Sequence, residues 1–114
     1  MSILLEETFY PGEAGFSFEI RTGVDMSNLI DGEIKGVIGR PNGSTVNRVI
    51  PMAKVNDLVT GTVYFDIEST DFTESGNYTM QIYVKDADGG LARPSHLIRF
   101  EVQDGIVDAA KIFV

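Results

Sequence analysis

The 114-residue chain contains no cysteine and no tryptophan, and its single histidine is His96. Without cysteine it can form neither a disulfide framework nor a thiolate site. A catalytic or metal-binding histidine needs companions at defined spacing, and His96 has no such partner in the sequence. We therefore predict no enzymatic activity, no catalytic residues, no bound metal and no cofactor.

Basic residues are also scarce, with nine lysines and arginines against 17 acidic residues and a net charge of −8. Because nucleic-acid binding needs clustered positive charge, this balance argues against a nucleic-acid partner and against an anionic membrane surface. No apolar run approaches the ~20 residues of a membrane helix, and the acidic N-terminus does not resemble a signal peptide. We expect a chain that is made in the cytoplasm and kept or assembled there.

Apolar residues alternate with polar ones in several short segments, and no segment has a sustained helical period. Tyr78, Met80, Ile82 and Val84 fall on one face of the clearest of these segments. Since strand side chains point to opposite faces in turn, this alternation predicts one buried face and one solvated face. The strands expected on this basis cover residues 2–8, 15–22, 33–40, 44–55, 61–68, 77–85 and 97–102.

Glycine, proline and asparagine indicate how these strands are joined or interrupted. The Asn42-Gly43 pair predicts a tight turn. Gly36, inside a strand, indicates a bulge or a close backbone approach, and Pro51 weakens the second half of the 44–55 strand. We also expect a short helical turn over residues 70–75, capped by Asp71.

The segment around Tyr78 favours one fold in particular. This tyrosine follows Gly76 by two residues and enters a strand, which is the arrangement of the tyrosine corner in immunoglobulin-like domains. Turn signals spaced by roughly ten residues are typical of a sandwich or barrel. We predict an all-β, immunoglobulin-like antiparallel β-sandwich of about seven strands over residues 1–103.

Residues 9–103 resemble the immunoglobulin-like domain of tailed-phage structural proteins, most closely the N-terminal domain of phage baseplate upper proteins. The resemblance is carried by Gly15-Phe-Ser-Phe-Glu-Ile, by the turn Arg40-Pro-Asn-Gly-Ser, by Gly61-Thr-Val-Tyr-Phe and by the segment from Asp71 to Val84. It implies a non-enzymatic subunit of a bacteriophage virion, such as a baseplate or tail adaptor or a capsid decoration protein. Its implied partners are other virion structural proteins and further copies of itself.

The last segment, residues 104–114, is unusually apolar for the end of a soluble chain. We interpret it either as an extra strand on its own domain or as an arm that adds to a neighbouring subunit. The residues expected to bind a partner are in this segment and in the first strand: Ile106, Val107, Ile112, Phe113, Val114, Ile3 and Leu5.

Two further features leave alternatives open. Asp86 and Asp88 could bind calcium through hard oxygens, although aspartate and glycine also suit a hairpin turn for backbone reasons. Tyr64 and Tyr83 could form an aromatic platform, and cross-strand packing also accounts for them. The alternative function is accordingly a module that binds a carbohydrate or a cell-surface ligand through the loops at one end of the sandwich.

Overall fold

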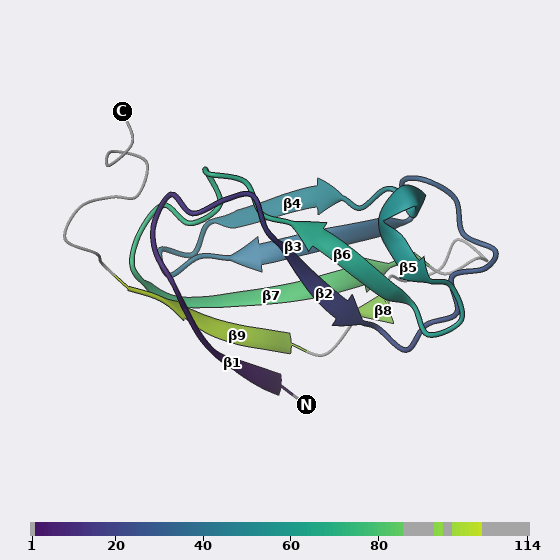
Figure 1. The fold of residues 1–114 in the computed structure, drawn as a ribbon, viewed down its shortest axis with the longest axis horizontal. Coiled ribbons are helices and arrows are strands. Elements are labelled where there is room, and N and C mark those ends of the chain that lie inside the picture. Colours follow the sequence, from purple (N-terminus) through teal and green to yellow (C-terminus); the bar gives the residue numbers. More distant parts are fainter. Residues whose placement is uncertain (1, 86–92, 95–96, 104–114) are drawn as a thin grey trace.

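The computed structural model describes residues 2–85, 93–94 and 97–103, and two β-sheets pack face to face in it (Figure 1). The larger sheet has the strand order β1 (Ser2–Phe9), β9 (Leu97–Val102), β7 (Gly76–Val84), β3 (Ile34–Gly39) and β4 (Thr45–Val49). The two-residue strand β8 (Arg93–Pro94) pairs with the end of β7.

The smaller sheet has the order β2 (Ser17–Arg21), β6 (Thr62–Asp66) and β5 (Val55–Asp57), and it lies in front of the larger one in Figure 1. The only helix in the described residues is the three-residue 3-10 turn η1 (Met52–Lys54), so no helix there is long enough to cross a membrane. The prediction of an all-β sandwich is confirmed.

One pair of strands departs from the predicted antiparallel arrangement. Strand β1 pairs with β9 in parallel, with Ile3 opposite Ile98. A parallel pair needs a long connection between its strands, and here nearly the whole domain separates the first strand from the last. Strand alternation indicates which residues are buried, but it does not indicate strand direction, so this pairing was not visible in the sequence.

The core lies between the two sheets and consists of the residues that alternation placed inward. Tyr78, Met80, Ile82 and Val84 are all buried, as predicted. A cluster of aromatic rings fills one half of the core, with neighbouring centroids 5.4 to 6.3 Å apart. Its members are Phe9, Phe16, Phe18, Phe72, Tyr78 and Phe100. Offset and edge-on contacts of this kind add to the hydrophobic stabilisation of a core.

The predicted strand over residues 44–55 is wrong in one respect, because the chain changes sheet within it. Strand β4 ends at Val49, and Pro51 forms the N-cap of η1, after which β5 joins the smaller sheet. Proline has no N–H to donate to a ladder, so the larger sheet ends where Pro51 stands. The proline was seen as a weak point, and it marks a crossover between the sheets.

Gly36 is a position of close approach, one of the two interpretations drawn from the sequence. A Cβ at this position would lie 1.7 Å from Cε2 of Phe65, which belongs to the opposite sheet. The register of β3 with β4 is continuous through Gly36, so the strand has no bulge there. The missing side chain lets the Phe65 ring lie directly on the backbone of β3.

Candidate functional site

A buried ion pair holds the larger sheet to the turn after β6. Arg48, on β4, donates from both terminal nitrogens to Asp71, with N–O distances of 2.6 and 2.7 Å. The Asp71 side chain is only 1% exposed, and its Oδ2 also accepts a bond from the backbone N–H of Glu68. This bidentate geometry is the strong form of a carboxylate–guanidinium contact.

The remaining contacts of Arg48 also lie within the domain. The guanidinium stacks over the Phe65 ring at 5.0 Å and donates to the carbonyl of Asp66. The hydrogen bond to Asp71 is the main cause that raises the pKa of Arg48 above its ordinary value. A hollow of about 160 Å³ adjoins it between β4 and β6, close to Lys54. We interpret the cluster as a fastening between the sheets, since its polar groups bind one another.

The structure corrects the sequence interpretation of Asp71. Residues 69–71 form a simple turn, and no helical turn covers residues 70–75. The carboxylate bonds backward to Glu68 and across to Arg48, so it caps no helix. Tyr78 does make the contact of a tyrosine corner, because its hydroxyl donates to the Glu74 carbonyl at 2.7 Å.

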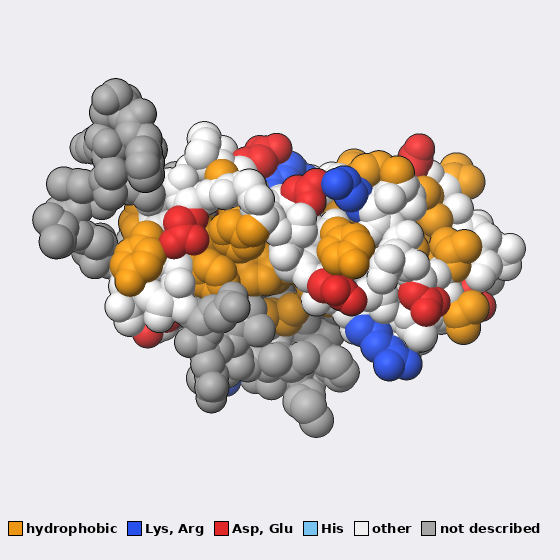
Figure 2. Space-filling view, viewed as in Figure 1, with side chains coloured by type: hydrophobic (Ala, Val, Ile, Leu, Met, Phe, Trp, Pro, Cys, Tyr) orange, Lys and Arg blue, Asp and Glu red, His pale blue; other side chains and the backbone are white. Residues whose placement is uncertain are grey.

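Exposed aliphatic side chains gather at one end of the sandwich. Ile30 is 68% exposed, Val59 is 70% exposed and Leu58 is 44% exposed. The two loops that carry them are joined, because the N–H of Met26 donates to the carbonyl of Leu58 at 2.7 Å. Figure 2 shows hydrophobic side chains at this end, at the right of the view, with acidic ones between them. We call Ile30, Leu58 and Val59 the apolar end.

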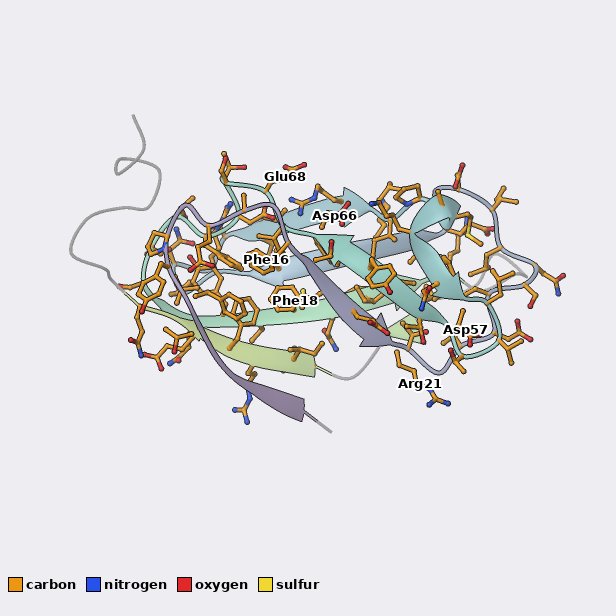
Figure 3. All side chains as sticks on the ribbon, viewed as in Figure 1. Phe16, Phe18, Arg21, Asp57, Asp66 and Glu68 are labelled. Atoms are coloured by element: carbon orange, nitrogen blue, oxygen red, sulfur yellow. The ribbon has the colours of Figure 1, made fainter. Side chains whose placement is uncertain are left out.

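Carboxylates hold these loops in shape. Glu33 Oε1 accepts a bond from the N–H of Ile30 at 2.9 Å, and Asp57 Oδ1 accepts one from the N–H of Val59 at 3.0 Å. Asp31 accepts a bond from the N–H of Met52. Figure 3 places Asp57 at this end, away from Asp66 and Glu68 beside the hollow. The exposed aliphatic side chains are therefore presented by bonded loops.

The sequence analysis did not find the apolar end. Met26 and Leu29, which precede Ile30 in the same loop, pack on the core. Ile30 instead points to solvent. The available signal was Leu58-Val59 inside the turn segment Asp-Leu-Val-Thr-Gly, where adjacent aliphatic residues serve no turn geometry.

The structure covers only part of the predicted partner-binding set. Ile3 and Leu5 lie in β1, at one edge of the larger sheet. Five residues lie outside the described part of the chain: Ile106, Val107, Ile112, Phe113 and Val114. His96, Asp86 and Asp88 also lie outside it. Among the residues that the structure describes, no group of three or more potential ligands could hold a metal ion.

Tyr64 and Tyr83 do not form a common aromatic platform. Tyr64 lies on β6 in the smaller sheet and Tyr83 on β7 in the larger sheet. Each alternates with buried residues of its own strand, so the two rings face outward on opposite sides of the sandwich. The sugar-platform interpretation of this pair is wrong.

Comparison with known proteins adds no relative. No protein-family model matches the sequence, and a search of curated proteins found no significant match.

Proposed function

We propose that this chain is a non-enzymatic structural subunit of a bacteriophage virion that acts through protein–protein contacts. The role would be that of a baseplate or tail adaptor or of a capsid decoration protein, assembled in the host cytoplasm. Its partners would be other virion structural proteins and further copies of itself. The sequence resemblance over residues 9–103 suggests this setting.

The observation that carries the proposal is the apolar end. Three of the five most exposed large hydrophobic side chains of the described residues lie there, on two loops joined by a hydrogen bond. Isolated exposed aliphatic residues are ordinary, but a group of them on shaped loops is typical of a protein-binding surface.

Two arginines support a role in protein binding over one in nucleic-acid binding, because their side chains are already bonded to groups of this domain. Arg40 donates to the carbonyls of Thr70 and Asp71, and Arg48 is paired with Asp71. These two arginines therefore hold loops of the domain, and they offer little to a phosphate backbone.

The sheet edges at β1 and β4 provide main-chain groups that a neighbouring strand can pair with.

The arm in residues 104–114 is the second part of the proposal, with Ile106, Val107, Ile112, Phe113 and Val114 as its contact residues. Removing it should lower the mass of the assembled species in sedimentation analysis without loss of the folded domain. If the full-length chain is a stable monomer and the shortened chain is less stable, the segment belongs to its own domain and the arm is refuted.

Particle association tests the virion role directly. An antibody to the chain should detect it, in a fixed ratio to the major structural protein, in particles purified by density gradient from cells that produce it. Recovery of the chain only in the soluble fraction, beside complete particles that lack it, would refute the proposal. Specific binding to a purified cell-surface glycan, with none to particles, would favour the alternative ligand-binding role.

A further inference from the structure

We infer that two different surfaces of this domain bind each other between neighbouring copies, so that the chain assembles head to tail. The first surface is the apolar end, with Ile30, Leu58 and Val59. The second is the outer face of the larger sheet. This inference rests on the proposed function, because it names the partner of a surface that the proposal treats as a protein-binding site.

The apolar end is strongly acidic. The loops at residues 22–33 and 55–61 contain four carboxylates and no lysine or arginine. The carboxylates belong to Asp25, Asp31, Glu33 and Asp57. The hydrogen bond from the Ser27 hydroxyl lowers the pKa of Asp25 below its ordinary value. An apolar centre with a negative rim suits a partner that has apolar side chains among positive charges.

The loops are also shaped before any partner arrives. Ile30 is held by Glu33, and Val59 is held by Asp57, through bonds to their backbone N–H groups. A surface that is already ordered loses less conformational entropy on binding. The carboxylates thus both shape the apolar end and supply its charge.

The outer face of the larger sheet has the complementary character. Alternation along β3, β7 and β9 directs Lys35, Tyr83 and Arg99 outward. Lys35 is paired across the strands with Val49 on one side and with Tyr83 on the other, so a cation lies between two apolar side chains. Val49 is 48% exposed.

The part of this face formed by β4, β3, β7 and β9 has a charge opposite to that of the chain. Lys35, Lys85 and Arg99 stand there against one carboxylate, Glu101, so this part of the face has a net charge of +2 in a chain of −8. Contact between the apolar ends of two copies would bring four carboxylates against four, which is unfavourable. Contact between the apolar end of one copy and the outer face of the larger sheet of another brings opposite charges together.

A contact between two different surfaces has a structural consequence. Each copy then has one free end and one free face, so further copies can add until a ring closes or a filament grows. The second copy is therefore the partner that charge and apolar character favour.

Two single variants test the contact. Val59→Glu places a charge in the apolar end, and Lys35→Glu reverses the charge between Val49 and Tyr83; both positions are exposed. Glu19→Lys is the control, because it reverses an exposed charge in the middle of β2, on the smaller sheet. Far-UV circular dichroism checks that each variant is folded.

Sedimentation analysis of the full-length chain should show association beyond the 12.5 kDa monomer at low salt, weakened as the salt concentration rises. Each interface variant should raise the dissociation constant by about tenfold or more, and the control should leave it unchanged. A mixture of the two interface variants should form a one-to-one dimer, because each retains the surface that the other has lost. Contact between identical surfaces would not give this recovery.

The inference is overturned if the wild-type chain stays monomeric at low salt up to about millimolar concentration, where weak contacts are populated. It is also overturned if both variants associate as the wild type does, or if their mixture remains monomeric. Particle association separates this failure from that of the proposed function. A monomeric chain found in purified particles would refute the head-to-tail contact and leave the virion role standing.

Discussion

Replacing Asp71 by asparagine should destabilise the domain more than any other conservative change of a polar side chain in the described residues. The substitution keeps the size of the side chain and removes its charge. It leaves the Arg48 guanidinium, 25% exposed, without the carboxylate that accepts bonds from both of its terminal nitrogens. Removing one partner of a buried pair costs about 3–5 kcal/mol.

The structure places the expected cost toward the lower end of that range. Arg48 keeps its bond to the carbonyl of Asp66, and the Glu68 carboxylate lies 3.6 Å from its Nη1. These contacts compensate in part for the lost charge, so we expect about 3 kcal/mol for Asp71→Asn. Arg48→Met should cost a similar amount, because it leaves the Asp71 carboxylate buried and unpaired.

Urea unfolding followed by far-UV circular dichroism measures these free energies, since the chain has no tryptophan. The double variant should cost clearly less than the two single variants together, because it leaves no unpaired charge. Lys54→Met is the matched control: Lys54 is half exposed where it pairs with Asp66, so this change should cost under about 1 kcal/mol. The reasoning is refuted if Asp71→Asn costs no more than the control, or if the two single effects simply add.

Three further measurements test other parts of the structure. Gly36→Ala should lower the stability by about 3 kcal/mol in thermal unfolding, because the new methyl group would overlap the ring packed against it; an unchanged midpoint would contradict this close approach. Tyr78→Phe should cost about 1 kcal/mol through the lost hydroxyl bond, and a neutral effect would show that the corner contact contributes nothing. The pKa of Asp66 is lowered chiefly by the hydrogen bond from the Ser17 hydroxyl and also by Lys54. The contribution of Asp66 to stability is therefore present above the pKa that this group has in the unfolded chain, and it is lost as pH falls through the pKa that it has in the folded chain. In Ser17→Ala, NMR titration of the Asp66 carboxyl carbon should show a higher pKa, so that the loss begins at higher pH; an unmoved titration would contradict the bond.

The sequence by itself determined where most of the strands lie and which side of an alternating strand is buried. Tyr78, Met80, Ile82 and Val84 follow the period of two that any strand imposes on its side chains, so the pattern was sufficient. The Asn42-Gly43 turn was similarly local: Gly43 has a φ of 88°, and Asn42 Oδ1 accepts a bond from the N–H of Ser44. These features depend on neighbours within a few residues.

Only the tertiary structure decided what those strands meet. It placed Arg48 against Asp71, 23 residues away in sequence, and it made Pro51 a crossover between sheets. It also joined the loop that carries Ile30 to the turn that carries Leu58 and Val59. Alternation records whether a side chain faces the core, but it carries no information on which strands pair or which loops share an end. The apolar end and the outer face of the larger sheet depend on that arrangement, so they appeared only when the two sheets were in place.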